Sequence, residues 1–217
     1  MYNRKMLQVA EIFKSIQGES SHAGLPCAFV RLTGCHLRCV WCDTQYAFYG
    51  GRPMSQDSIL ETVDALGLKL VEVTGGEPLL QAEVYPLLQA FLDGGYTVLL
   101  ETSGAILLDR VPPGVIKIVD LKCPGSGEVE KNCYANLDLL GGGDEVKFVI
   151  ADRADYEWCR DIIARHRLHE KAGILVSTVY GQLELKDLAD WVLQDGLPVR
   201  MQTQLHKLIW GQDAIGV

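Results

Sequence analysis

Apolar residues fall along the chain in short runs and in helical spacings that follow one another. Residues 7–13 and 27–32 form runs typical of strands, and the polar residues 17–24 between them predict a loop. Ser55 suits a helix cap, and apolar residues recur every three or four positions from there towards Gly67. A strand is predicted over 70–74 and a helix over 79–92. The first half thus predicts strands and helices in succession.

The second half continues this alternation. Residues 153–168 and 185–193 have helical spacing, with Asp152 as the cap of the first helix. The predicted strands are apolar throughout, which is typical of a parallel sheet with helices on its faces. We predict an α/β fold in which helices cover a mostly parallel sheet. The later strands are expected at 96–101, 115–121, 145–150, 174–179 and 198–202.

Polar residues gather directly after the predicted strands. Thr74, Glu101 with Thr102, Asp120 and residues 202–204 all occupy such positions. Because the carboxyl ends of parallel strands meet at one edge, ligand sites of α/β folds form there. We therefore expect these residues to contribute to one site.

The size, composition and charge of the chain argue against several classes of function. The 217 residues, 48% of them apolar, predict a single domain over 1–217 with a sizeable core. No apolar run approaches the ~18 residues of a membrane helix, so no membrane association is expected. A net charge of −8 argues against nucleic acid as a partner. The first residues lack the apolar region of a signal peptide, so we expect a cytoplasmic location.

Three of the seven cysteines lie within eight residues, at Cys35, Cys39 and Cys42. An odd number crowded in this way fits a secreted disulfide framework badly. Three thiolates on one loop can hold three corners of a [4Fe-4S] cube and leave the fourth iron without a protein ligand. The alternative is a closed zinc site, which needs a fourth ligand such as His36 or Cys27. The spacing favours the cluster and leaves both open.

The triplet and a second motif together resemble the radical S-adenosylmethionine (SAM) superfamily. The second motif, residues 74–78, reads Thr-Gly-Gly-Glu-Pro and follows a predicted strand. In that superfamily the cysteines hold the cluster and the Gly-Gly-Glu turn contacts the methionine end of SAM, which chelates the open iron. Glycines there allow backbone to approach closely. The resemblance implies a shortened, partly open (β/α) barrel with the cluster loop at residues 34–44.

Further segments are similar to the 7-carboxy-7-deazaguanine synthase family. That family contracts the ring of 6-carboxy-5,6,7,8-tetrahydropterin to 7-carboxy-7-deazaguanine and releases ammonia, a step towards queuosine and other 7-deazapurines. A 5′-deoxyadenosyl radical takes the C6 hydrogen and later returns it, so SAM is a catalytic cofactor, and Mg²⁺ assists. The matching segments are residues 15–19, 24–26, 29–35, 41–44, 101–104, 120–122 and 204–207.

The resemblance implies ligands for each cofactor. Cys35, Cys39 and Cys42 would hold one [4Fe-4S] cluster. Thr44 would bind Mg²⁺, a hard cation that takes oxygen ligands. The residues implied for SAM are Trp41, Cys42, Asp43, Gly76, Glu101, Ser103, Asp120, Lys122, Ser126, Gln202 and Gln204, with His206 beside them.

The implied substrate residues come from both ends of the chain. The early loop would read the amino-pyrimidinone edge of the pterin, and Arg31 would pair with its carboxylate. The Val217 carboxylate is expected to help enclose the substrate. The implied set is Ile16, Gln17, Gly18, Glu19, Arg31, Thr74 and Val217.

Each role has a structural alternative. Thr44 could satisfy a loop backbone group, Arg31 could serve only in a salt bridge, and Trp41 could be packed hydrophobe. The double glycine at 75–76 could be a purely structural turn. A lone histidine such as His206 is usually structural.

Two positions depart from the family pattern. Ser20 stands where glycine is usual, and Thr203 stands where proline is common. The glycines at 141–143 lack a Walker-type Lys-Ser/Thr and predict a turn or hinge. Cys159 lies on a helical face and predicts a core residue. The other cysteines outside the triplet are Cys27, Cys123 and Cys133, too few ligands for a second cluster.

Two other functions remain open at this stage. A glycyl-radical-enzyme activase is a similarly short radical SAM protein, but it would lack the pattern around Gln17, Glu19 and Arg31. A non-catalytic zinc- or cluster-binding module would not cleave SAM after reduction. The family resemblance further implies a homodimer and an electron donor such as flavodoxin.

Overall fold

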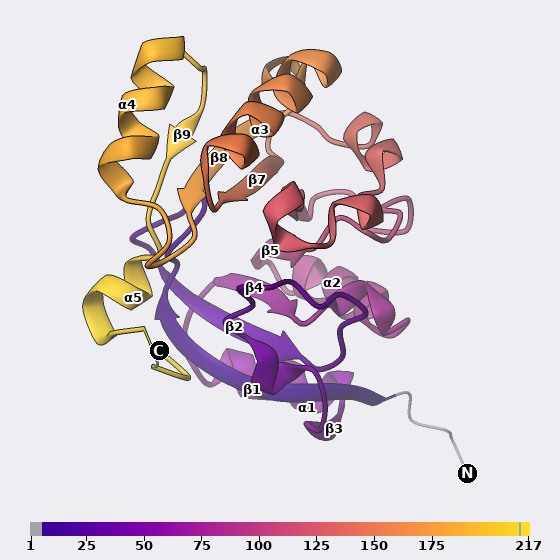
Figure 1. Cartoon of the computed structure of the whole chain (residues 1–217). Coiled ribbons are helices and arrows are strands. Elements are labelled where there is room, and N and C mark those ends of the chain that lie inside the picture. Colours follow the sequence, from indigo (N-terminus) through magenta and orange to yellow (C-terminus); the bar gives the residue numbers. More distant parts are fainter. Residues whose placement is uncertain (1–5, 213) are drawn as a thin grey trace.

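One curved, nine-stranded sheet forms the frame of the molecule in a computed structural model that describes residues 6–212 and 214–217 (Figure 1). The strand order is β3-β1-β2-β4-β5-β6-β7-β8-β9. From β2 to β9 all neighbours are parallel, whereas β1 pairs antiparallel with both β2 and β3. Within the described residues β3 and β9 are the two edges, so the sheet is an open barrel. The predicted α/β fold, shortened and partly open, is confirmed.

The elements follow in regular order. The strands are β1 (Met6–Ile16), β2 (Pro26–Leu32), β3 (Arg52–Ser55), β4 (Leu70–Gly75), β5 (Thr97–Thr102), β6 (Ile116–Asp120), β7 (Glu145–Ile150), β8 (Gly173–Thr178) and β9 (Arg200–Met201). The helices are α1 (Gln56–Asp64), α2 (Val84–Asp93), α3 (Arg153–His166), α4 (Leu185–Asp195) and α5 (Leu205–Trp210), with short 3-10 turns between them.

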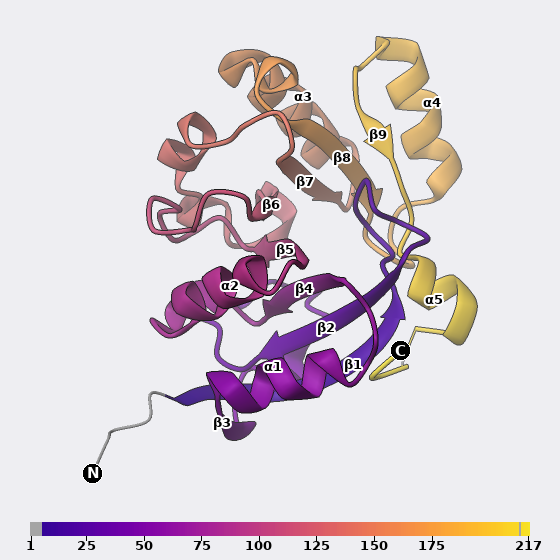
Figure 2. The ribbon, with the colours of Figure 1, turned by 180° about the vertical axis from the view of Figure 1, so that it is seen from behind.

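The sheet has two different faces. On the outer face α1 to α4 pack against the strands (Figure 2), and one continuous core includes Phe91, Phe148 and Tyr156, all buried. On the inner face a small apolar layer of Leu99, Ile118 and Leu175 is buried without a helix residue. This layer closes the barrel below the carboxyl ends of the strands. Helix α5 and the segment after it lie beside β1, apart from the other helices (Figures 1 and 2).

Most predicted elements are confirmed within a few residues. Ser55 caps α1 by accepting from the Ser58 amide, and Asp152 caps α3 by accepting from the Asp155 amide. Cys159 is fully buried in the core, as predicted. Among the described residues no helix is long and apolar enough to cross a membrane.

Four predictions of elements were incomplete. The helix predicted over 79–92 is a 3-10 turn, Pro78–Leu80, followed by α2, because the extended backbone of Gln81 interrupts the helical path between them. Strand β9 has only two residues, at the open edge. Strand β3 and helix α5 were missed, since both are short and depend on tertiary contacts rather than on a repeating pattern.

Candidate active site

A cavity of about 760 Å³ opens at the carboxyl ends of the strands. It is lined by the cluster loop (residues 34–44), the early loop after β1, the ends of β4 to β7, and the chain from α5 onwards. The polar residues that follow the strands therefore meet in one place, as the parallel arrangement predicts. Thr74, Glu101 and Asp120 all line this cavity.

The cluster loop is held by backbone contacts rather than by regular structure. The Gly34 amide donates to the Ala47 carbonyl at 2.9 Å, and the Val40 amide donates to the Ser126 carbonyl at 3.1 Å. Leu37 is buried beneath the loop. These contacts fix the loop while its three cysteines line the cavity.

The three thiols of the loop are partly exposed and unpaired. Burial raises the pKa of Cys39 to about 11 and raises those of Cys35 and Cys42 less. Metal binding would release their protons, since thiolates are the ligands. Among the described residues no three His, Cys, Asp or Glu side chains converge on a point for one metal ion, as a zinc site requires. Three thiolates on separate corners of a cube bind different irons, so the loop fits a [4Fe-4S] cluster.

The double glycine at the end of β4 is required by close packing, of Gly75 against β2 and of Gly76 against the cluster loop. A Cβ at Gly75 would lie 2.7 Å from the Leu32 amide nitrogen, and one at Gly76 would lie 2.8 Å from Cys35 Cβ. The Glu77 amide donates to the Gly34 carbonyl at 2.7 Å. The turn thus fixes the position of the first cysteine, which is a reason for the glycines in addition to the predicted contact with SAM.

Glu77 ties this turn to the end of β5. Its carboxylate is fully buried and accepts from Thr102 Oγ1 at 2.9 Å, from the Ser103 amide at 2.8 Å and from Ser103 Oγ at 2.5 Å. The hydroxyl proton of Ser103 is therefore donated to Glu77. A contact from Ser103 Oγ to a SAM hydroxyl would have to be made as an acceptor.

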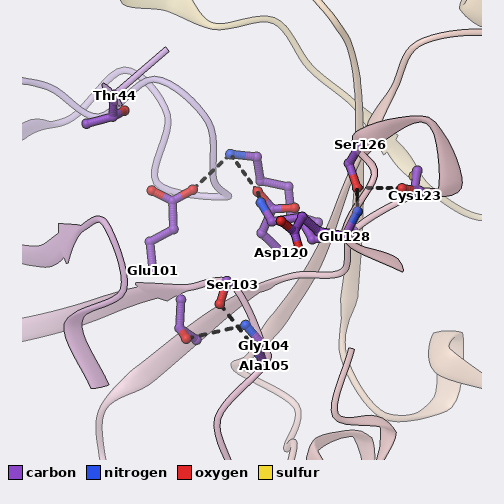
Figure 3. A network of polar contacts seen from close by, with 12 residues as sticks. Thr44, Glu101, Ser103, Gly104, Ala105, Asp120, Cys123, Ser126 and Glu128 are labelled. Atoms are coloured by element: carbon purple, nitrogen blue, oxygen red, sulfur yellow. Dashed lines mark hydrogen bonds and ion pairs between the residues drawn. The ribbon is translucent and has the colours of Figure 1, made fainter. Parts of the chain in front are cut away.

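A carboxylate–lysine network, formed by Glu19, Glu101, Asp120 and Lys147, occupies the inner wall of the cavity. Lys147 Nζ donates to Glu101 at 2.8 Å, forms a short ion pair with Glu19, and lies 4.0 Å from Asp120. Figure 3 shows Glu101 and Asp120 converging from neighbouring strands. Although burial acts to lower it, the pKa of Lys147 is raised well above its usual range by these carboxylates. The network places one ammonium among three carboxylates.

Asp120 carries a buried oxygen that has no partner among the described residues. Its Oδ2 pairs with Lys122 Nζ at 2.9 Å, while Oδ1 is buried and unsatisfied. An unmade hydrogen bond of this kind costs stability unless a ligand completes it. Ribose hydroxyls or the amino group of SAM would supply the missing donor, so these residues fit the cofactor. Asp120 and Lys122 remain predictions for that contact.

Arg31 on β2 is held with one edge towards the cavity. Its Nε donates to Glu11 Oε1 at 2.7 Å, and its guanidinium lies near the rings of Phe13 and Tyr46. Tyr46 also donates to Glu11, at 2.7 Å. Arg31 thus forms the salt bridge of the structural alternative, yet its Nη groups have no hydrogen-bond partner among residues 6–212 and 214–217. They suit a substrate carboxylate.

Two side chains of the early loop, Gln17 and Glu19, have different contacts. Gln17 is buried: its amide oxygen accepts from the Glu19 and Ser20 amides, and its Nε2 donates to Glu72 at 2.9 Å. Gln17 therefore shapes the loop, and the backbone of Gly18 packs on the start of α5 at Leu205. Glu19 points to Lys147. Ile16, Gln17, Gly18 and Glu19 all line the cavity, as expected of a substrate loop.

Asp43 links the cluster loop to α5. Lys207 Nζ donates to Asp43 Oδ2 at 2.8 Å, and Gln204 Nε2 donates to the same oxygen at 3.3 Å. Although burial acts to raise it, the pKa of Asp43 lies well below its usual range because of Lys207. Thr44 donates its hydroxyl proton to Asp43 Oδ1 at 3.0 Å, which leaves its lone pairs for a cation. Thr44 fits a hard metal and remains a predicted ligand.

Not every predicted residue reaches the cavity. Ser126 is buried away from it, with its hydroxyl donating to the Cys123 carbonyl at 2.6 Å (Figure 3), and Gln202 also lies outside the lining. Ser126 supports the cluster loop through the carbonyl that binds Val40. Both amide atoms of Gln202 are buried and unpaired among the described residues. The other predicted residues, Trp41, Gly76, Gln204 and Val217 included, line the cavity.

Three charged residues of the site were missed by the sequence analysis. Glu72 and Lys147 are single charged residues inside apolar strand runs, and Lys207 ends the motif at 204–207. A charge at a strand centre is costly unless it is paired or faces a polar cavity, and that signal could have identified the first two. Lys207 gave no separate signal, because its partner Asp43 lies far away in sequence.

Comparison with known proteins identifies the family. The sequence model of the radical SAM superfamily matches residues 29–181. The 7-carboxy-7-deazaguanine synthase of Chlorobaculum tepidum is 52% identical over 214 residues, 97% of each chain. The 7-carboxy-7-deazaguanine synthase of Koribacter versatilis is 48% identical over 226 residues, and the match covers 97% of this chain and 100% of that relative.

A solved structure has the same fold. The crystal structure of QueE from Escherichia coli matches with a TM-score of 0.76 at 22% identity, over 91% of this chain and 94% of that one. At this identity the likeness concerns the fold alone, and the sequence relatives carry the family assignment. The chain is a radical SAM enzyme and belongs to the 7-carboxy-7-deazaguanine synthase family.

Proposed function

We propose that this protein converts 6-carboxy-5,6,7,8-tetrahydropterin to 7-carboxy-7-deazaguanine with release of ammonia, as a lyase on the route to queuosine and related 7-deazapurines. The observation that carries this proposal is one cavity lined both by the three cysteines and by Arg31 and Glu19. A radical formed beside the cluster would therefore meet a carboxylated heterocycle without leaving the cavity. The names of the sequence relatives support the same reaction.

The cofactors belong to the rim of the cavity. Cys35, Cys39 and Cys42 would hold the cluster, and Gly76 and Asp120 would contact SAM. Bound together, cluster and SAM supply the 5′-deoxyadenosyl radical. The other predicted SAM contacts are Trp41, Asp43, Glu101, Ser103, Lys122, Ser126, Gln202 and Gln204.

The chain's own side chains orient the pterin. Arg31, fixed by Glu11, binds the substrate carboxylate through its Nη groups. Glu19, ion-paired with Lys147, accepts hydrogen bonds from the amino-pyrimidinone edge. Further substrate contacts come from Ile16, Gln17, Gly18, Thr74 and Val217.

Thr44 would hold Mg²⁺, which would assist the reaction. A hydroxyl oxygen beside the Asp43 carboxylate suits an oxygen-seeking cation. Chelation with EDTA lowers turnover, and added Mg²⁺ restores it. Replacement Thr44→Val raises the Mg²⁺ concentration needed for half-maximal turnover, whereas activity that does not respond to EDTA contradicts the assignment.

Partners follow from the family. The proposal takes residues 1–217 as one domain and, from the family resemblance, includes a homodimer. Electrons come from a reductant such as flavodoxin, in a cytoplasmic setting. Sedimentation of the pure protein tests the homodimer.

The reaction is tested by oxygen-free reconstitution with iron and sulfide, followed by incubation with SAM, a reductant and the pterin. Mass spectrometry should show a product lighter than the substrate by one ammonia, with SAM recovered intact. If the pterin stays unchanged while SAM is split to methionine and 5′-deoxyadenosine, a glycyl-radical-enzyme activase is favoured instead. If SAM is not cleaved in any mixture, the chain is a non-catalytic module.

A further inference from the structure

Glu72 is a buried acid of the cavity that the proposed reaction leaves without a role. It lies at the centre of β4, is 3% exposed and lines the cavity. In the sheet its neighbours are Phe29 on β2 and Leu99 on β5, and Leu99 belongs to the apolar layer that closes the barrel. Glu72 therefore lies where the polar cavity meets its apolar base.

No cation among the described residues pairs with Glu72. Its hydrogen-bond partner is the neutral amide of Gln17, which donates to Oε2 at 2.9 Å. Lys147, the nearest ammonium, bonds instead to Glu19 and Glu101. A buried carboxyl without a counter-charge stays protonated, because ionisation there is costly.

The surroundings of Glu72 raise its pKa on balance. Burial is the largest effect and raises its pKa to about 8, with a further rise from the negative charges of Glu101 and Glu19. The Gln17 hydrogen bond and the charge of Lys147 oppose this rise, while the buried thiol of Cys27 on β2 stays neutral.

Its neighbour Glu101 behaves in the opposite way. Burial acts to raise the pKa of Glu101, but the adjacent ammonium of Lys147 lowers it below its ordinary value. Two carboxyls whose surroundings separate their protonation states can take different roles in one site. Near neutral pH a protonated Glu72 therefore lies beside an ionised Glu101.

We propose that Glu72 contacts the substrate as a neutral carboxylic acid and binds a donor–acceptor edge of its amino-pyrimidinone ring. This inference rests on the proposed function and adds a residue that determines specificity. Gln17 donates to Glu72 Oε2, so the proposal assigns the proton to Oε1. From Oε1 the proton is donated to a ring acceptor, such as the carbonyl oxygen of the pyrimidinone or an unprotonated ring nitrogen.

The chemistry of the ring explains why two kinds of carboxyl are useful. A carboxylate only accepts, so Glu19 matches an edge made of N–H donors. A neutral acid can donate, so Glu72 matches the carbonyl oxygen or unprotonated ring nitrogen that Glu19 would repel. Together they distinguish a pterin from a ring with its donors and acceptors exchanged, because a mismatched buried polar group would be left unpaired.

Equilibrium binding of the pterin tests this proposal. The reconstituted full chain with SAM, but without reductant, is titrated with 6-carboxy-tetrahydropterin between about pH 6 and pH 9. For the wild type, Kd should rise up to about tenfold per pH unit above the pKa of Glu72. Glu72→Gln keeps a neutral donor, so its Kd should stay within about threefold of wild type at pH 6–7 and should not show this rise.

Two more variants complete the experiment. Glu72→Ala should bind the pterin at least about tenfold more weakly at every pH, because the ring acceptor loses its partner. Glu61→Gln, on the exposed side of α1, removes a carboxylate elsewhere and should follow the wild type. Iron content and circular dichroism of each variant establish that it is folded.

The outcomes separate the inference from the function. If the wild type and Glu72→Gln lose affinity in parallel above pH 8, or if Glu72→Gln is as weak as Glu72→Ala, the role of Glu72 is wrong. In either case wild-type binding still supports the proposed function. If the wild type binds no pterin at any pH, both the proposed function and the role of Glu72 are contradicted.

Discussion

The cluster loop and the carboxylate–lysine network face each other across one cavity, but they are built differently. The loop is a continuous segment fixed by backbone hydrogen bonds and by the close packing of Gly76 on Cys35. The network joins side chains from the early loop and from β5, β6 and β7, fixed by one buried ammonium. The first arrangement depends on backbone shape and the second on charge balance.

This difference separates the two sides in function. Changes at the loop should reduce iron content, and changes at the network and its substrate neighbours should reduce pterin turnover with iron intact. A variant that breaks this rule would show that the two sides fold as one unit. Four variants test it, from the largest expected effect to the smallest.

Lys147→Met should have the largest effect. It leaves three carboxylates around the position of one lost cation, and breaking a buried ion pair costs about 3–5 kcal/mol. We expect a lower free energy of unfolding in urea and loss of detectable turnover. The control Lys186→Met removes an exposed ion pair with Asp190 and should change neither. Unchanged turnover in Lys147→Met would contradict the network.

Arg31→Ala should reduce turnover without affecting the cluster. Loss of a charge-assisted contact with the substrate carboxylate predicts a fall in kcat/KM of about 10–100-fold, mostly through KM. Iron content, measured by metal analysis, should stay at the wild-type level. Loss of iron in this variant would show that Arg31 is a structural residue. It would also contradict the proposed separation between cluster binding and pterin turnover.

Gly76→Ala tests the loop side. The added Cβ would lie 2.8 Å from Cys35 Cβ, so the loop must shift, at a cost of about 1–3 kcal/mol. Iron retained after reconstitution should fall below the wild-type level. Gly142→Ala is a matched control, since nothing lies within 4 Å of its added Cβ. Equal iron content in both variants would mean that the contact does not position the cysteine.

Glu72→Gln should have the smallest effect, seen in the pH dependence of stability. The pKa of Glu72 is raised from 4.5 to about 8, so the folded protein binds the extra proton between these values and stability falls as pH rises. The free energy of unfolding of the variant, relative to that of wild type, should therefore increase by about 1–2 kcal/mol from roughly pH 5.5 to pH 7. If urea unfolding gives the same difference in free energy between variant and wild type at both pH values, the protonation of Glu72 is contradicted.

The sequence was sufficient for the loop side because its signals are local. Cys35, Cys39 and Cys42 lie close together, and the motif at 74–78 directly follows a strand. The same local patterns predicted most strands and helices, with caps at Ser55 and Asp152. The partners of Glu77 required the structure, since Thr102 and Ser103 lie at and just after the end of another strand, and so did Lys207, the partner of Asp43.

The network side was only partly predictable, for a physical reason. Glu19, Glu101 and Asp120 were expected, each from its own motif or strand end, but their common partner Lys147 lies in an apolar run of β7. Its importance comes from the register that places it between carboxylates distant in sequence. Glu72 was missed in the same way, and α5 was too short to show a period.

The most direct test of the whole account is Mössbauer spectroscopy of the oxygen-free, ⁵⁷Fe-reconstituted protein, with metal analysis of the same sample. The account predicts one [4Fe-4S] cluster per chain and a change in the signal of one iron when SAM is added, because that iron has no protein ligand. One tetrahedral zinc per chain without a cubane cluster would contradict it.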